Sequence, residues 1–141
     1  MTVSISLNYQ SSLSHTFDIH VFIKQALQLK HVHEGSLEFT FIDDDYMILL
    51  HQTYLQDKST TDIMTFNLDS LIRPIGDIYI CVNEAQRNSQ AYQTSLDEEI
   101  KQLILHGILH LIGYNDLNDF DKMYMLDEQN RLLMLLNSSI S

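Results

Sequence analysis

The sequence predicts a single α+β domain over residues 1–141, with a central mixed β-sheet of about four strands packed against helices. Short segments that alternate apolar and polar residues, as strands do, are interspersed with longer segments of helical period. The chain has 141 residues, which is enough for one well-packed core. An apolar content of 45% is ordinary for a globular protein, and the chain has no repeat, low-complexity tract or linker.

The first half of the chain is predicted to alternate strands and helices. Residues 3–9 alternate apolar and polar side chains and predict a strand. Residues 17–30 carry apolar side chains at helical spacing, and Gly35 lies in the turn that follows. Residues 37–42 alternate again and predict the second strand. Three successive aspartates then are typical of the N-cap and first turn of a helix over residues 43–54.

Two further strands are expected in the middle of the chain. Residues 57–61 are polar and predict a loop. Residues 62–66 and 76–82 are short apolar segments, joined by a loop or hairpin connection, and predict a strand each. Asn83 can then cap a short helix that ends near Tyr92.

The last third of the chain predicts two longer helices. Ser95 and Glu98 match a capping box, which opens a helix over residues 96–112. That helix is apolar on most sides and is therefore expected to be central and buried. Asn118 or Asp119 opens the final helix. Its apolar side is expected to carry Met123, Leu126, Leu132, Leu133 and Leu136.

Two histidines on the predicted central helix indicate a metal site. His106 and His110 are four residues apart, so both imidazoles project from one face, one turn apart. Gly113 ends the helix, and the chain can fold back to present Asp116 as a third ligand. Such a set leaves a coordination position open, which is typical of catalytic sites. The alternatives are a pair of hydrogen-bonded core histidines, and an aspartate that only caps the next helix.

Gly107 separates two kinds of chemistry. A glycine inside a helix costs about 1 kcal/mol relative to alanine, so a strand or a substrate is expected to pack closely beside His106. Zinc proteases of the His-Glu-x-x-His type place their general base, a glutamate, directly after the first histidine. Here that position holds Gly107, so a protease would take its base from elsewhere.

The charge balance restricts the class of partner. The chain has eight Lys and Arg residues and 19 Asp and Glu residues, which gives a net charge of −11. This balance argues against a broad basic surface that would bind nucleic acid. A nuclease remains compatible, because a bound cation adds positive charge and Lys58, Arg73, Arg87 and Lys101 could cluster. The single cysteine, Cys81, favours a reducing, cytoplasmic setting. We expect no signal peptide and no membrane partner, because no apolar segment approaches about 20 residues.

Three segments resemble the YbeY family. Residues 106–116, His-Gly-Ile-Leu-His-Leu-Ile-Gly-Tyr-Asn-Asp, are similar to the family signature His-Gly-x-Leu-His-Leu-x-Gly-Tyr-Asp-His. Residues 61–66, Thr-Asp-Ile-Met-Thr-Phe, resemble its Thr-Asp-Val-Leu-Ser-Phe strand. Residues 76–81, Gly-Asp-Ile-Tyr-Ile-Cys, resemble its Gly-Asp-Ile-x-Ile-Cys strand. Order, spacing and chain length agree, so the resemblance covers nearly the whole chain.

The resemblance implies a zincin-like fold whose metal-binding helix lies in the C-terminal half. It implies a single-strand-specific, metal-dependent endoribonuclease of rRNA processing and ribosome maturation, acting at the 16S rRNA 3′ end, with the small ribosomal subunit as partner. His106, His110 and Asp116 would then be the catalytic and metal-binding residues. The family carries histidine where Asp116 stands and arginine where Leu55 stands. An oxygen ligand widens the expected metal from Zn²⁺ to Mn²⁺ or another divalent ion.

Two other functions stay open at this point. One is a metallopeptidase-like hydrolase that uses the same site. The other is a non-enzymatic, ribosome-associated factor in which the metal only braces the fold. We also expect Tyr114 or Phe66 to offer a stacking surface to RNA bases, with core packing as the alternative for each. The acidic surface could serve a protein partner.

Overall fold

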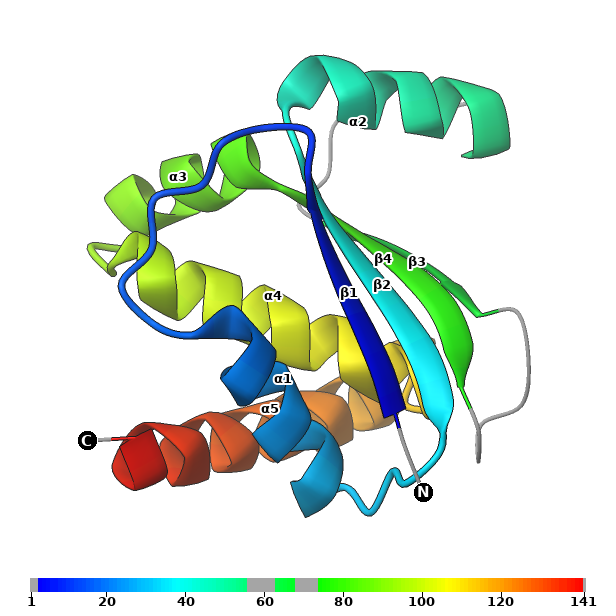
Figure 1. The fold of residues 1–141 in the computed structure, drawn as a ribbon, viewed down its shortest axis with the longest axis vertical. Coiled ribbons are helices and arrows are strands. Elements are labelled where there is room, and N and C mark those ends of the chain that lie inside the picture. Colours follow the sequence, from blue (N-terminus) through cyan, green and yellow to red (C-terminus); the bar gives the residue numbers. More distant parts are fainter. Residues whose placement is uncertain (1–2, 56–62, 68–73, 141) are drawn as a thin grey trace.

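A mixed four-stranded sheet packed with helices forms the architecture, as predicted (Figure 1). The computed structural model describes residues 3–55, 63–67 and 74–140. The elements in chain order are β1 (Val3–Tyr9), α1 (Ile19–Leu29), β2 (Gly35–Ile42), α2 (Asp44–Leu50), a π-helical segment (His51–Leu55), β3 (Ile63–Asn67), β4 (Ile75–Cys81), α3 (Val82–Ala91), α4 (Leu96–Leu111) and α5 (Asp119–Ile140). The predicted loop over residues 57–61 lies outside the described residues.

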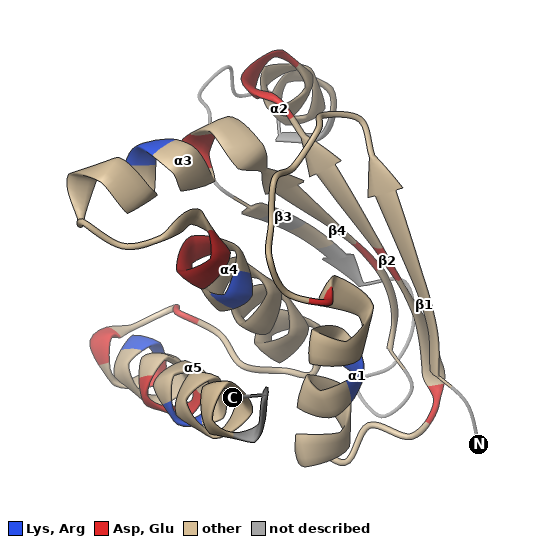
Figure 2. Cartoon of the chain, turned by 60° about the vertical axis from the view of Figure 1, so that its left-hand side comes forward, with Lys and Arg blue, Asp and Glu red and all other residues tan. Residues whose placement is uncertain are grey.

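The sheet is mixed, in the order β1-β2-β4-β3. Strands β1, β2 and β4 are parallel, and β3 pairs antiparallel with β4. The parallel pairs need long connections, which α1 and the segment from α2 to β3 supply. Helix α4 contacts β3 and β4, and α5 packs on the far side of α4 (Figures 1 and 2). Helix α4 is therefore the central layer between the sheet and α5.

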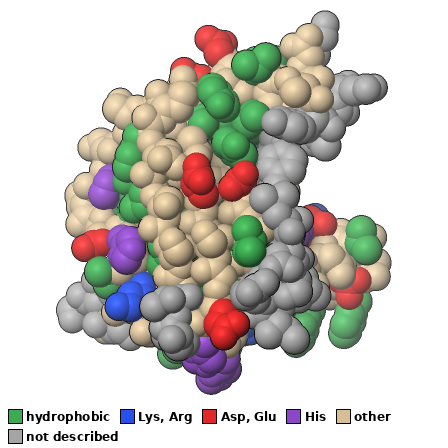
Figure 3. Space-filling model, turned by 45° about the vertical axis from the view of Figure 1, so that its right-hand side comes forward, with side chains coloured by type: hydrophobic (Ala, Val, Ile, Leu, Met, Phe, Trp, Pro, Cys, Tyr) green, Lys and Arg blue, Asp and Glu red, His purple; other side chains and the backbone are tan. Residues whose placement is uncertain are grey.

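The predicted alternation of the strands places one face of the sheet in the core. Phe39 and Phe41 of β2 and Ile78 and Ile80 of β4 are fully buried. Their neighbours point to the opposite face, as the period of two in a strand requires. On that outer face Glu38 lies in register with Asp77 on β4. Figure 3 looks onto the outer side of the sheet, where acidic side chains gather near the middle.

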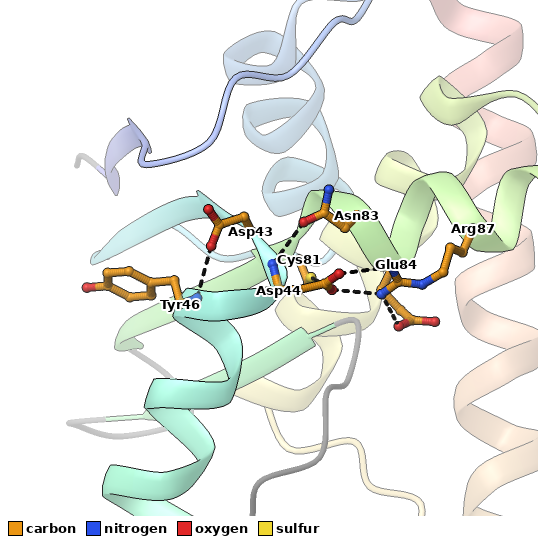
Figure 4. A network of polar contacts seen from close by, with 7 residues as sticks. All are labelled: Asp43, Asp44, Tyr46, Cys81, Asn83, Glu84 and Arg87. Carbon is orange, nitrogen blue, oxygen red and sulfur yellow. Dashed lines mark hydrogen bonds and ion pairs between the residues drawn. The ribbon is translucent and has the colours of Figure 1, made fainter.

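The corner between α2 and α3 is held by charge-assisted hydrogen bonds (Figure 4). Arg87 binds both carboxylate oxygens of Asp44, at 2.9 and 2.7 Å, and also binds Glu84 at 2.7 Å. The hydrogen bond from Arg87 holds the pKa of Asp44 below its ordinary value. Burial, with a hydrogen bond from the thiol to Asp44, raises the pKa of Cys81 to about 11. Cys81 is therefore a protonated, structural thiol.

One predicted cap is wrong. Helix α3 begins at Val82, so Asn83 lies within its first turn, and Cys81 stands at the N-cap position without a capping side chain. The Asn83 side chain instead accepts a hydrogen bond at 2.8 Å from the backbone N–H of Asp44. It joins α3 to the start of α2, a tertiary contact that local sequence does not announce.

The apolar side of α5 is rotated from the predicted one. Leu132 and Leu136 are buried and Leu133 packs half-buried against the core, as predicted. Met123 and Leu126 are instead 57% and 44% exposed, and Met125 is the buried residue of this part of the helix. Within the described residues, no helix has the length and apolar content that crossing a membrane requires.

Gly35 is required by a close backbone approach at the start of β2. Its φ of +138° is one that other residues rarely adopt, and a Cβ there would lie 2.3 Å from the carbonyl oxygen of Pro74. The same oxygen accepts a hydrogen bond from the backbone N–H of Ser36. This contact fixes the beginning of the β2–β4 pairing.

We expect Gly35→Ala to lower the free energy of unfolding by about 2–4 kcal/mol, because it combines an unfavourable φ with a backbone collision. Urea denaturation measures this change. Ser36→Ala, at the exposed neighbouring position, is the matched control and should stay within about 0.5 kcal/mol of the parent. Equal stability of all three proteins would show that the β2 start is not constrained as described.

Candidate metal centre

Helix α4 begins as the sequence predicts. The hydroxyl of Ser95 accepts a hydrogen bond from the backbone N–H of Glu98 at 3.1 Å. The first turn carries three acidic residues, whose negative charges interact favourably with the positive end of the helix dipole. The Glu98 carboxylate accepts from the Asn137 side chain at 3.3 Å. This contact ties the start of α4 to the end of α5, and the helix runs buried from there to the histidines.

Gly107 allows the helix to lie directly on the sheet. A Cβ at this position would lie 3.0 Å from Cγ2 of Ile78 and 3.1 Å from Cδ1 of Ile63. Those distances are tighter than ordinary contacts, so any side chain would push α4 away from β4 and β3. Of the two explanations that the sequence offered, the structure supports helix–sheet packing. It also leaves no room at position 107 for a carboxylate that could act as a base.

The two histidines converge as their spacing predicts. The Nε2 atoms of His106 and His110 lie 3.0 Å apart, with the rings nearly perpendicular at 80°. Two nitrogens at about 2.0–2.1 Å from a tetrahedral ion would lie roughly 3.3 Å apart. The observed separation is close to that value. Both rings are half-buried, so solvent can reach this pair from one side.

The Nδ1 atoms decide which way the lone pairs point. Nδ1 of His110 lies 3.2 Å from the backbone carbonyl oxygen of Tyr114, which can only accept. Nδ1 of His106 lies 3.1 Å from Oε1 of Gln129, also an acceptor in this orientation. Both rings therefore donate from Nδ1, and in the neutral state each turns the lone pair of Nε2 towards the other ring. A cation or a shared proton must lie between them, and metal-binding histidines are oriented in this way.

Asp116 completes the group, as predicted. Gly113 adopts a φ of +111° after the last turn of α4, and the N–H of Tyr114 bonds back to the carbonyl of Leu109 at 2.9 Å. The chain then reverses and brings Asp116 to the histidines. One ligand atom from each of His106, His110 and Asp116 lies within 4.8 Å of the others. Two nitrogens and one oxygen fit a divalent transition ion and leave a coordination position for water or substrate.

Two small cavities open beside His106. One, of about 100 Å³, is lined by His106, Asp116, Lys122, Met125, Leu126 and Gln129. The other, of about 220 Å³, is lined by Glu99, Gln102, Leu103, His106 and Gln129. The three-residue group is thus reachable from the surface between α4 and the start of α5.

Gln129 is a site residue that the sequence analysis missed. It lies on the inner side of α5 at 6% exposure, among apolar residues, and hydrogen bonds to His106. A polar residue at helical spacing between Met125, Leu132 and Leu136 was the available signal. A buried amide needs a partner, and the first histidine of the pair is that partner.

Tyr114 is held from two sides and does not offer both faces of its ring to RNA. Its ring stacks on Tyr124 with centroids 5.6 Å apart, and its hydroxyl accepts from Lys30 at 2.7 Å. Lys30 also binds Glu128. Most of the Tyr114 side chain therefore packs within the protein, which was the alternative to a stacking surface for RNA. The side chain of Phe66 lies outside the described part of the structure.

The Lys30–Glu128 pair connects α1 to α5 beneath this tyrosine. Hydrogen bonds from Arg131 and Lys30 lower the pKa of Glu128 to about 2. Burial alone would lower the pKa of Lys30, but its bonds to Glu128 and Tyr114 raise it above the ordinary value. Both members of the Lys30–Glu128 pair are therefore charged across the neutral pH range.

Among the described residues, Arg87 and Lys101 do not form the cluster of cations that the sequence left open. Arg87 is bound to Asp44 on α2, and Lys101 bonds to Asn137 at 3.0 Å and lies near Glu98 at 3.9 Å. Lys58 and Arg73 lie outside the described residues, as does the side chain of Leu55. Figure 2 shows acidic residues at the starts of α2, α4 and α5, with few basic residues among them.

Replacing Glu128 should make stability depend on pH in a defined direction. A folded pKa of about 2 against an ordinary 4.5 adds stability above pH 4.5, which is lost as the pH falls towards 2. We expect Glu128→Gln to cost about 1–3 kcal/mol at pH 7 and much less at pH 2.5, measured by chemical denaturation. Asp127→Asn, on the exposed side of α5, is the control. An equal cost at both pH values would mean that Glu128 acts by packing and not by charge.

Three comparisons with known proteins point to one family. The model of a protein family described as "Endoribonuclease YbeY" matches residues 5–137. The chain is 32% identical to the endoribonuclease YbeY of Flavobacterium psychrophilum over 74% of each chain. It is 30% identical to that of Christiangramia forsetii, over 85% of this chain and 84% of the relative. The solution structure of a Thermotoga maritima protein superposes with a TM-score of 0.69, covering 96% of this chain and 90% of that one. At 20% identity, that likeness concerns the fold.

Proposed function

Because the chain belongs to the YbeY family of endoribonucleases, we propose that it is a metal-dependent hydrolase of single-stranded RNA whose active centre is formed by His106, His110 and Asp116. The observation that carries the proposal is the pair of facing Nε2 atoms 3.0 Å apart, each on a ring whose Nδ1 already donates elsewhere. Asp116 within 4.8 Å of this pair supplies the third ligand and a negative charge.

The donor set favours Zn²⁺, and Mn²⁺ or another divalent ion stays possible because one ligand is an oxygen. When bound there, the ion would polarise a phosphoryl oxygen and lower the pKa of water towards neutrality. The protein's own contribution is orientation. The Tyr114 carbonyl and the Gln129 amide fix the tautomer and the plane of the two imidazoles, and rigid orientation of ligands raises their affinity.

A metallopeptidase-like activity is the second candidate, and the packing of Gly107 argues against it. The His-Glu-x-x-His type of peptidase needs a carboxylate directly after the first histidine. Ile78 and Ile63 occupy the space that such a side chain would enter. A peptidase reaction at this centre would need a base from another part of the chain.

A purely structural metal is the third candidate. Structural zinc sites have four protein ligands and are closed. Among the described residues the group has three members, one of them exposed, and a cavity of about 100 Å³ adjoins it. These features support a site that exchanges ligands with solvent, as catalysis requires.

The finer role we propose follows from the family. It is ribosomal RNA maturation in the cytoplasm, at the 3′ end of the small-subunit 16S rRNA, with the small ribosomal subunit as the partner. A net charge of −11 fits an enzyme that does not hold RNA over a broad basic surface. The acidic surface could instead meet a basic ribosomal or other protein partner.

His110→Ala tests the metal centre directly. We expect the native protein to carry about one divalent ion, and the variant to lose it together with at least roughly 100-fold of the cleavage rate on a single-stranded rRNA fragment. Elemental analysis and gel assays measure these. His20→Ala, an exposed histidine of α1, is the control and should behave as the parent. Metal without cleavage in the parent would favour the structural role, whereas absence of metal would remove the site.

Gln129 tests the orientation of His106. Gln129→Ala should weaken metal binding by roughly 10- to 100-fold, since loss of the second-sphere hydrogen bond leaves the imidazole free to turn. Gln129→Glu keeps an acceptor at the same place and should retain most of the affinity. Competition with a chromogenic chelator measures both. Equal affinity of the alanine variant and the parent would show that Gln129 only fills space.

A further inference from the structure

Lys122 occupies an unusual position beside the metal centre. It lies in the first turns of α5 and lines the cavity of about 100 Å³ together with His106 and Asp116. The remaining walls come from Met125, Leu126 and Gln129. The Lys122 side chain, which is exposed to solvent, thus lines the same small cavity as two of the three proposed ligands.

Most other described cations are held by acidic neighbours. Lys30 and Arg131 bind Glu128. Arg87 binds Asp44 and Glu84, and Lys101 lies near Glu98. Lys24 lines a separate cavity with Val3 and His20, between α1 and β1. Within the described part of the chain, Lys122 is therefore the basic residue that combines access to the metal cavity with the lack of an ion pair.

This placement carries a cost unless an anion joins it. A lysine that lines the same cavity as a divalent cation would repel that cation, and solvent moderates the repulsion because Lys122 and Leu126 are exposed. An anion that contacts both charges removes the conflict. The proposed substrate has such a group at every residue, the phosphodiester, and lysine binds phosphate as a point charge.

We propose that Lys122 is a substrate-binding residue whose ammonium group contacts a phosphate of single-stranded RNA next to the metal centre. The proposal rests on the proposed function, since it takes RNA as the substrate. Although the chain has a net charge of −11, Lys122 would supply one favourable electrostatic contact to the RNA beside the proposed centre.

RNA binding tests the proposal separately from cleavage. The probe is a short single-stranded 2′-O-methyl RNA, recovered intact after titration and followed by fluorescence anisotropy at several salt concentrations. We expect Lys122→Ala in the metal-loaded protein to weaken binding roughly tenfold. The slope of log K against log salt should become shallower by about 0.7, the value for one phosphate contact on a single strand. Lys122→Arg should keep most of the RNA affinity and most of the salt slope. Lys24→Ala is the matched control and should behave as the parent.

Metal affinity, measured on the same variants, separates the outcomes. Lys122→Ala should bind the metal as tightly as the parent or more tightly, because a repulsive charge is gone. If this variant binds RNA with the parent's affinity and salt slope, the proposal is wrong. If it loses metal along with RNA, Lys122 acts on the centre itself and the proposal is also wrong. If the parent fails to cleave RNA while Lys122→Ala still shows the expected binding change, the hydrolase function fails and the phosphate contact stands.

Discussion

Two imidazoles facing each other through Nε2 are the constraint on which the rest of this structure depends. The spacing of His106 and His110 brings the rings together, but spacing alone does not orient them. The carbonyl oxygen of Tyr114 and the amide oxygen of Gln129 each accept a hydrogen bond from one Nδ1–H. Neutral rings fixed in this way repel each other unless a cation lies between them. The burial of α4, the turn at Gly113 and the inner side of α5 all serve to hold this arrangement.

The fold makes that arrangement rigid by placing α4 between two layers. Gly107 lets the helix touch Ile78 and Ile63 on the sheet, directly beside the first histidine. On its other side α5 contributes Gln129, and the Lys30–Glu128 pair joins α5 to α1. A displacement of either layer would change the distance between the ligands. Catalytic constellations need support of this kind, because small errors in ligand position are costly.

Much of this could be read from the sequence, and the failures share one cause. The strand over Val3–Tyr9 and the cap at Ser95 follow from local period and local hydrogen bonding, and both were predicted. The convergence of His106, His110 and Asp116 was predicted because these residues lie within eleven residues of one another. Asn83, Gln129 and the rotated face of α5 were missed because each depends on a partner distant in sequence. Asn83 accepts a hydrogen bond from the start of α2, and Gln129 hydrogen bonds to a histidine 23 residues away.

The charge pattern places further limits on how this protein can meet RNA. Acidic or amide side chains of the same chain bind Arg87, Lys101 and Arg131. These cations are therefore largely paired within the fold. Long-range attraction by a broad basic surface is then weak, and affinity must come from short-range contacts at the centre. A divalent ion bound by His106, His110 and Asp116 would keep a net positive charge, since Asp116 is the only negative ligand of the three. Such an ion would concentrate positive potential at the proposed centre, which would favour recognition of RNA at the reacting phosphodiester over recognition along the strand.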